Sequence, residues 1–314
     1  MTKLAANWQF LLMNQILRGK YFMRPEIALG LGMQATEVLN KVDGDSRQKR
    51  SINLTTISTS GVESSHLMMD LDDEEEEDKD SGNIYDGAPE GSVAMVPIKG
   101  NMMKYGTMCE YGMVEIAEYI KAAAVHKNIG AIVLDIDTGG GGVDAIAPIV
   151  DAVNLARANG KPVVASVDMA CSAGYWAASV CDYIVADNNI SSEVGSIGVM
   201  CTFQDLQGYY EKEGIKVHHI YSSESENKNE AFHLALEGKY ELIKETELDP
   251  LARSFQNAIK ENRSGKLDLS AKGVLNGKTY FAQEALSIGL IDRVGSKSTA
   301  IDIALAKSHV KQYL

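Results

Sequence analysis

The sequence predicts an α/β protein whose sheet is largely parallel. Two observations support this fold class. Short, β-branched apolar runs of strand length alternate with segments of helical periodicity, and glycine-rich turns fall where a predicted strand gives way to a predicted helix. The 314 residues, 45% hydrophobic and 23% charged, have the composition of a globular protein with a sizeable core.

The first half of the alternation begins at Ser92 with an apolar, β-branched run, SVAMVPIKG, that ends at Gly100. The next apolar residues recur at helical spacing, and a buried strand follows them. The predicted elements here are strand 92–100, a helix presenting Met113, Ile116, Ala117, Ile120 and Ala124, strand 130–137, helix 143–158 and strand 162–168.

The second half continues the pattern after a small-residue turn at Ser172. A polar-apolar helical region near the C-terminal end is interrupted by Pro250, which cannot continue a helix. The predicted elements are a helix after Ser172, strand 182–187, strand 196–200, helix 204–213, strand 216–221 and a helical region 236–263 broken near Pro250.

The chain divides into four predicted parts. Residues 1–42 form an N-terminal arm with amphipathic helices at 10–17 and 26–42, and 43–91 form an acidic, disordered linker. From Asp70 to Asp80 the linker holds nine acids and one lysine, most of the net charge of −13, and such a run repels itself. The globular domain covers 92–307, and 308–314 form a tail.

Charge and composition exclude several classes of function. No basic stripe is present to neutralise phosphates, so we expect no nucleic-acid partner. No uninterrupted apolar run is long enough for a membrane span, and the first residues lack the features of a secretory signal. Cys109, Cys171, Cys181 and Cys201 lack CxxC spacing and read as reduced thiols. The six histidines form no HExxH pattern, so we expect no metal and no cofactor.

The first unusual turn is Asp137–Gly142, DTGGGG, which follows a predicted buried strand. Consecutive glycines let the backbone approach a ligand and direct N–H groups at an anion or oxyanion. The run matches neither the P-loop nor the GxGxxG pattern. A flexible tight turn is an equal alternative at this point.

The second turn, Met169–Tyr175, places Ser172 between small residues at a strand-to-helix junction. A nucleophile can stand exposed there, with the next N–H helping to form an oxyanion hole. Helix capping is the alternative role for this serine, and Cys171 is the competing nucleophile. No histidine lies in these turns, so a His-based triad has little support. The third turn, Glu193–Val199, sets Ser196 between Gly195 and Gly198 and could be a simple turn before a strand.

Taken in order, these segments resemble the signal peptide peptidase A family of serine-lysine peptidases. The matching stretches are DTGGGGVD (137–144), MACSAGYWAAS (169–179), GSIGV (195–199) and NGKTYFAQEALSIGLIDRVG (276–295), within 92–303. The resemblance implies a Clp protease/crotonase-like spiral of β-β-α units. LLMNQILRGKYFM (11–23) and the acidic linker resemble the phage branch, whose members are head maturation proteases that cut scaffold and capsid proteins inside the prohead.

The same resemblance implies roles for individual residues. Ser172 matches the family nucleophile and Ser196 the hydroxyl that orients the base. Lys228 is the nearest candidate for the general-base lysine of a Ser-Lys dyad, which explains the missing histidine. The family's oxyanion-hole region corresponds to Gly140, Gly141 and Ala173.

Three departures from the family pattern are visible. Thr138-Gly139 stands where the family has Ser-Pro, and Ala173 where it has glycine. Glu226 falls at the spacing where the lysine is expected.

The sequence thus predicts a serine endopeptidase that matures viral capsids, acting in the host cytoplasm or inside the prohead. Its expected partners are capsid, scaffold or portal proteins and further copies of itself. One alternative is a cytoplasmic housekeeping peptidase of the same family, and another is a catalytically silent assembly factor. An acyl-CoA enzyme of the crotonase type would share the fold without explaining the CSAGY and GSIGV segments.

Overall fold

The computed structural model describes residues 50–69, 83–106, 110–203, 205 and 207–311, together with the backbone of strand β1 (Lys20–Met23). The acidic run at 70–80 and the helices predicted for 10–17 and 26–42 lie outside the described residues. Within the predicted helical arm, the four described residues are extended.

The main sheet has the strand order β11-β9-β7-β5-β4-β2-β3, and β8 and β12 extend it from β7. Strands β4, β5, β7, β8, β9 and β12 run parallel to their neighbours within this group, whereas β2, β3 and β11 pair antiparallel at the two ends. The expected α/β fold with a mostly parallel sheet is therefore confirmed. The strands are β2 (Ser51–Ile57), β3 (Glu63–Met69), β4 (Ser92–Lys99), β5 (Ile129–Thr138), β7 (Val163–Cys171), β8 (Tyr183–Ala186), β9 (Glu193–Gly195), β11 (Thr279–Phe281) and β12 (Arg293–Val294).

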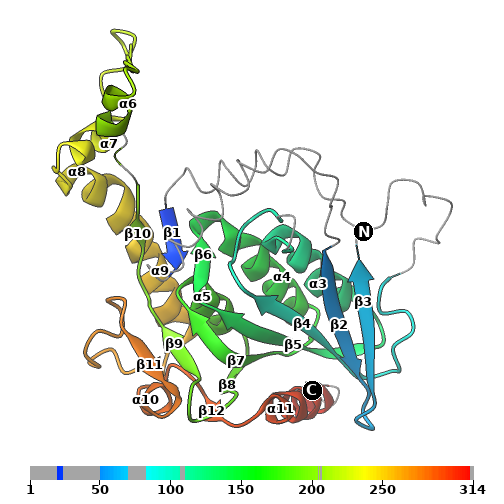
Figure 1. Ribbon diagram of the computed structural model, residues 1–314. Helices are drawn as coiled ribbons and strands as arrows, with labels where there is room; N and C mark the ends of the chain where they lie inside the picture. The colour runs from blue at the N-terminus through cyan, green and yellow to red at the C-terminus, as the bar shows by residue number, and fades with distance from the viewer. Residues whose placement is uncertain are drawn as a thin grey trace, which may run out of the picture.

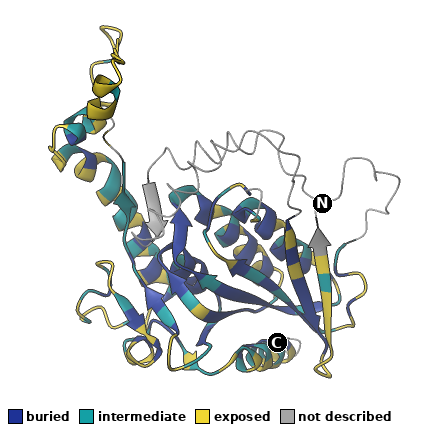
Figure 2. Cartoon of the chain, in the orientation of Figure 1, coloured by how far each residue is buried: buried dark blue, intermediate teal, exposed yellow. Residues whose placement is uncertain are grey.

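The central strands are apolar on both faces because helices cover both (Figures 1 and 2). On β5, Ile132 and Leu134 join the large core beneath helices α3 (Met113–Val125) and α4 (Ile146–Ala158). The alternate Val133 faces the other way, toward Ala300 and Ala304 of helix α11. α11 spans Lys297–Lys311, so the predicted tail at 308–314 is helical up to Lys311.

The region predicted as a disordered linker, 43–91, contains a β-hairpin, so that prediction is wrong for β2 and β3. Strand β2 pairs antiparallel with β4, with Thr56 opposite Ala94, and Leu54 is fully buried. Arg50, just before β2, forms a buried ion pair with Glu115 of α3 at 3.0 Å. The globular body therefore begins at the hairpin and not at Ser92. The acidic run at 70–80 dominates the composition of this region, and the prediction from composition therefore overlooked the alternating pattern of SINLTTI (51–57).

The segment between β10 (Met200–Cys201) and helix α9 (Asp249–Asn262) forms an arm that projects from the body (Figure 1). The strand predicted at 216–221 does not form, because this exposed stretch has no neighbouring strand to pair with. The predicted break near Pro250 lies earlier, at 237–240, and Pro250 lies in the first turn of α9, directly after the π-helical turn 244–248. The arm contains α6 (Gln207–Lys212), α7 (Glu230–Leu236), α8 (Glu241–Ile243) and a π-helical turn (Lys244–Leu248).

Within the described part of the chain, the helices are all too short or too polar to cross a lipid bilayer.

Candidate active site

The three unusual turns meet at one edge of the sheet. Strands β5, β7 and β9 are consecutive and parallel, so their carboxyl ends lie side by side. Thr138 pairs with Ala170, and Cys171 pairs with Gly195. The sheet thereby brings the turn after β5, the turn after β7 and the turn after β9 together, although they are far apart in the sequence.

Ser172 occupies a strained position between β7 and helix α5 (Ala173–Ser179). Its backbone has φ 55° and ψ −116°, a conformation that a serine keeps only where its surroundings fix it. The Ser172 N–H donates to the Gly195 carbonyl at 2.8 Å, and its own carbonyl accepts from the Trp176 N–H at 3.0 Å. Its hydroxyl makes no capping bond and lies 3.4 Å from the Gly198 carbonyl. The capping alternative is therefore excluded.

Both candidate nucleophiles are covered. Cys171 is fully buried at the end of β7, and Ser172 is only 1% exposed. The expectation that Ser172 stands exposed is therefore wrong for this conformation. The turn points Ser172 toward the neighbouring strand ends, while Cys171 remains within the sheet.

Strand β6 (Gly140–Gly142) provides a glycine cradle next to Ser172, and α5 packs against it. The Gly140 carbonyl accepts from the Met102 N–H at 3.0 Å, and the Gly142 N–H donates to the Met102 carbonyl at 2.8 Å. A Cβ on Gly141 would lie 1.8 Å from the Met102 carbonyl oxygen, so only glycine fits there. Because backbone groups alternate along an extended strand, Gly141 directs its N–H away from Met102, toward β1.

The departure Thr138-Gly139 from the family pattern has a structural role. The Thr138 hydroxyl donates to the Gly100 carbonyl at 2.5 Å and accepts from the Gly140 N–H at 3.0 Å. A Cβ added to Gly174 would lie only 2.4 Å from the Thr138 methyl group. Thr138 therefore fixes the start of the glycine strand and packs against α5.

The third turn is held in place from behind by the loop before β11. Gly195 has φ 115° and Ser196 φ 55°, and the Ser196 N–H donates to the Lys278 carbonyl at 2.9 Å. A Cβ on Gly195 would lie 2.7 Å from the same oxygen. These two left-handed residues end β9, so the predicted strand 196–200 is wrong except at Met200.

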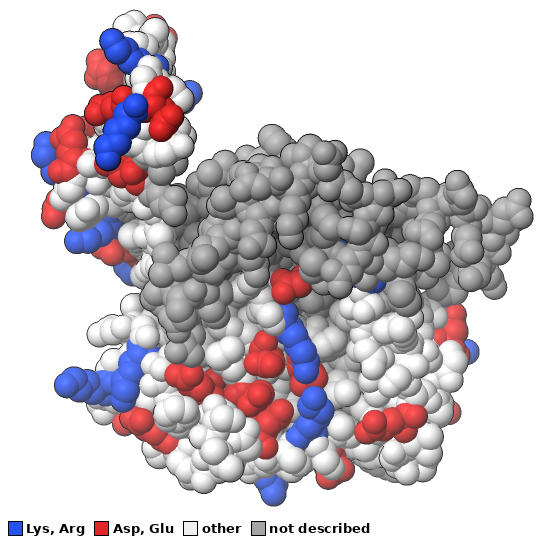
Figure 3. Space-filling view, viewed as in Figure 1, with Lys and Arg blue, Asp and Glu red and all other residues white. Residues whose placement is uncertain are grey.

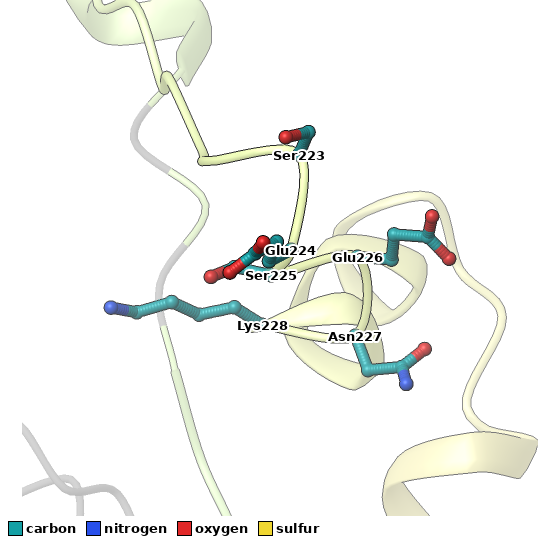
Figure 4. Close-up of a pocket in the computed structure, with 6 residues that line it drawn as sticks. All are labelled: Ser223, Glu224, Ser225, Glu226, Asn227 and Lys228. Carbon is teal, nitrogen blue, oxygen red and sulfur yellow. The ribbon is translucent and has the colours of Figure 1, made fainter.

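The base candidate lies elsewhere. Lys228 is exposed on the arm, in a turn where its N–H donates to the Ser225 carbonyl at 3.1 Å. Figure 4 shows its side chain directed away from Glu226 and Asn227, beside a shallow hollow lined by 223–228. Within one copy of the chain, the structure groups five predicted site residues and leaves Lys228 apart. The five are Ser172, Ala173, Gly140, Gly141 and Ser196.

Lys278, which the sequence did not single out, is the lysine tied to the third turn. Its ammonium group lies 2.9 Å from Glu284 and 4.3 Å from the centre of the Tyr280 ring. The hydrogen bond with Glu284 raises the pKa of Lys278 and so favours the charged form of its side chain. A general base has to be neutral, so this ion pair works against a role of Lys278 as the base.

Other titratable groups near the strand ends belong to the opposite face of the sheet. Burial raises the pKa of Asp137, and the nearby Asp168 adds to the rise. Asp135 accepts from Lys297 of α11 at 2.9 Å. His126 follows α3 and precedes the amino end of β5, at the other edge from the turns. Among the described residues, no group of three or more histidine, cysteine or acidic side chains could hold a metal ion.

Helix α5 is anchored on its other sides as well. The Tyr175 hydroxyl donates to the Leu290 carbonyl at 2.7 Å, and Trp176 stacks on Phe255 of α9 at 4.8 Å. These contacts fix the start of α5 beside the glycine strand, and backbone N–H groups at such a place are donors of the kind that form an oxyanion hole.

Comparison with known proteins defines the class further. Residues 155–311, half of the chain, match Peptidase family S49, and the chain belongs to this family. The match confirms the resemblance to signal peptide peptidase A that the three turns indicated.

Relatives come from phages, bacteria and plants. Capsid assembly protease C of Escherichia phage lambda is 29% identical over 222 residues, covering 67% of this chain and 48% of that protein. Protease 4 of Haemophilus influenzae is 26% identical over 200 residues, covering 60% and 30%. The chloroplastic serine protease SPPA of Arabidopsis thaliana is 30% identical over 197 residues, covering 62% and 28%. The chain thus spans between about a quarter and a half of these relatives.

Solved structures with a related arrangement include an enoyl-CoA hydratase/carnithine racemase from Magnetospirillum magneticum. It is 15% identical with a TM-score of 0.38, covering 71% of this chain and 72% of that one. A likeness at this level says nothing about the activity of this chain.

Proposed function

We propose that this peptidase is a serine endopeptidase in which Ser172 is the nucleophile. The observation that carries the proposal is the strained serine at the start of α5, fixed by a hydrogen bond to Gly195, on a helix that packs against a strand of three glycines. The Ser172 Oγ would attack the scissile carbonyl carbon, and the N–H groups of Gly141 and Ala173 would stabilise the resulting oxyanion. Ser196 would help to orient the base.

The base in this proposal is Lys228, and a second copy of the chain would supply it. The arm that carries Lys228 extends away from the sheet and from α5 (Figure 1). A lysine acts as a general base only when neutral, and burial in an apolar surrounding lowers a lysine's pKa toward that state. Docking of the arm on another copy would provide such burial.

The surface of the arm supports a homo-oligomer. Its charged side chains of both signs are interspersed with uncharged ones (Figure 3), and large apolar side chains are exposed along it. They are Tyr209, Ile215, Val217, Ile220, Tyr221, Phe232 and Tyr240. Apolar groups gathered on a projecting segment are typical of an interaction surface.

For the substrate, we propose scissile bonds in capsid, scaffold or portal proteins of a phage, cut in the host cytoplasm or inside the prohead. The relatives named capsid assembly protease C and head-tail preconnector protein GP5 support this role. The relatives named Protease 4 favour the second candidate, a cytoplasmic housekeeping peptidase. Co-expression with phage capsid and scaffold proteins separates the two, because only the first predicts a Ser172-dependent cut in them.

The nucleophile is tested with a fluorophosphonate probe and with unfolded casein as a general protein substrate. Ser172→Ala should abolish both labelling and cleavage, because it removes the attacking oxygen, while the melting temperature stays near that of the wild type. Cys171→Ala is the matched control and should keep both. Loss of activity in Cys171→Ala alone would make this a cysteine peptidase, and an inactive wild type would favour a silent assembly factor.

A further inference from the structure

Strand β1 lies in a slot between the glycine strand and the strand that follows the third turn. The small sheet has the order β10-β1-β6, and β1 pairs antiparallel with both neighbours (Figure 1). Phe22 lies opposite Gly141 on β6, and Tyr21 lies opposite Met200 on β10. An extended segment of this chain thus fills the middle position of the small sheet.

In this register the Phe22 carbonyl of β1 lies opposite the proposed oxyanion-hole donor, the N–H of Gly141. The Gly140 carbonyl and the Gly142 N–H are hydrogen-bonded to Met102, so the N–H of Gly141 faces the other side, toward β1. In an antiparallel pair, residues directly opposite exchange backbone groups at every second position. Phe22 is the residue opposite Gly141, which aligns its carbonyl with the N–H of Gly141.

We infer that β1 is the peptidase's own substrate, held in the cleft in a cleavable register and cut between Phe22 and Met23. The inference rests on the proposed function of Ser172. The Ser172 Oγ would attack the Phe22 carbonyl carbon, and the hydroxyl proton would pass to the base. The Phe22–Met23 C–N bond then breaks as the base returns the proton to the Met23 nitrogen. Water hydrolyses the Phe22 ester, which frees Ser172 and leaves a carboxylate on Phe22.

The burial of the nucleophile agrees with a tethered occupant. Ser172 is 1% exposed, yet a nucleophile that acts on other proteins has to meet their main chain. As long as β1 stays in the slot, a second peptide cannot pair with both β6 and β10. Removal of the segment up to Phe22 would therefore open the cleft.

The test follows the N-terminus of the full-length chain by intact mass and N-terminal sequencing. The wild type should lose residues 1–22 completely and begin at Met23, and Ser172→Ala should keep them. Phe22→Pro should stay uncut, because proline has no N–H to give to β6. This variant should nevertheless cut casein faster than Ser172→Ala, because its nucleophile is intact. Phe22→Leu keeps the main-chain groups and should be processed.

The outcomes separate this inference from the proposed function. If the wild type cuts casein through Ser172 but keeps residues 1–22, or is cut at another bond, the self-cleavage inference is wrong and the serine peptidase stands. If neither casein nor the N-terminus is cut and the fluorophosphonate does not label Ser172, both fail. Processing of Phe22→Pro at the same rate as the wild type would overturn the strand-pairing argument.

Discussion

Four residues with unusual backbones define the site at the smallest scale. Ser172, Ser196, Gly140 and Gly195 all have positive φ, and each follows or ends one of the parallel strands. For the two serines such a backbone costs about 1–3 kcal/mol each and persists only where the surroundings determine it, whereas glycine adopts positive φ readily. The Ser172 N–H bond to the Gly195 carbonyl joins the second turn to the third, and the Ser196 N–H bond to the Lys278 carbonyl holds the third turn to the loop before β11.

Gly141→Ala should damage this unit. The added Cβ would lie 1.8 Å from the Met102 carbonyl oxygen, and backbone cannot move as a side chain can. We expect a loss of about 1–3 kcal/mol in the free energy of unfolding, as for other overpacked sites, and loss of fluorophosphonate labelling. Gly142→Ala is the control, because its nearest neighbour is the flexible Asp144 carboxylate at 3.0 Å. Denaturant unfolding and the rate of fluorophosphonate labelling are measured for both variants. Equal stability and labelling of Gly141→Ala and Gly142→Ala would show that the close contact between Gly141 and Met102 does not matter.

Much of the site at this scale follows from sequence. The glycine run, the ACSAGY junction and the GSIGV turn indicate Ser172, Gly140, Gly141 and Ser196 because small residues permit close backbone approach. The choice between Cys171 and Ser172 required the backbone geometry, which only the structure gives: Cys171 is paired within the sheet, whereas Ser172 has a strained backbone at the start of α5. Met102 and Lys278 carry no sequence signal, because they act through their carbonyl groups and any residue type has one.

At the scale of elements, one buried ion pair joins α9 to the segment before β12. Arg263 is 2% exposed, and its guanidinium donates to both carboxylate oxygens of Asp292 and to the Gly289 carbonyl. Burial alone would raise the pKa of Asp292, but hydrogen bonds from Arg263 and Lys266 outweigh it and lower that pKa. The pair ties the helix that supports α5 to the sheet.

Arg263→Ala should therefore lower the free energy of unfolding at neutral pH by about 3–5 kcal/mol, because it leaves Asp292 buried without its main partner. A lowered carboxyl pKa stabilises the fold above the ordinary aspartate pKa, and this stabilisation fades as pH falls through the lowered value. The difference between wild type and variant should accordingly shrink in acid. Urea unfolding at several pH values measures it, with exposed Arg293→Ala as the control. A pH-independent difference would contradict the assignment.

Elements were predictable where periodicity and packing agree. The helix at 113–125 and strands β4, β5 and β7 follow directly from apolar spacing. The β2–β3 hairpin was missed because its alternating residues adjoin a strongly acidic run. The stretch 216–221 also contains β-branched and aromatic residues, but it is exposed with no strand to pair with, so no strand forms there.

For the whole molecule, the separation of Lys228 from Ser172 leads to a complementation experiment. If the base comes from another copy, Ser172→Ala and Lys228→Ala chains should each be inactive. An equal mixture of the two, assembled together, should regain about a quarter of the wild-type rate. Random pairing around a closed oligomer places an intact Ser172 beside an intact Lys228 in about a quarter of the sites. Lys212→Ala, Lys216→Ala and Lys239→Ala are controls and should keep activity. Casein cleavage is the readout, and size-exclusion chromatography checks assembly.

Two results would contradict this arrangement. Full activity of Lys228→Ala alongside a dead control would reassign the base to that control lysine. An unrestored mixture that still assembles would place Ser172 and its base in the same copy. The sequence could not predict whether Ser172 and its base lie in the same copy of the chain. The direction of an exposed arm depends on what it packs against and not on the pattern of its own residues.

The strand of three glycines also limits what this enzyme can distinguish. An edge without side chains contacts only the main chain of whatever lies beside it, so on that side all amino acids look alike. Such an edge accepts a segment only when the backbone N–H and C=O groups of that segment are not already hydrogen-bonded. A stretch already built into a helix or a sheet would not fit. If Ser172 acts beside this edge as proposed, its substrates are segments that are still unfolded or loosely held, and folding of such a segment would end access to it.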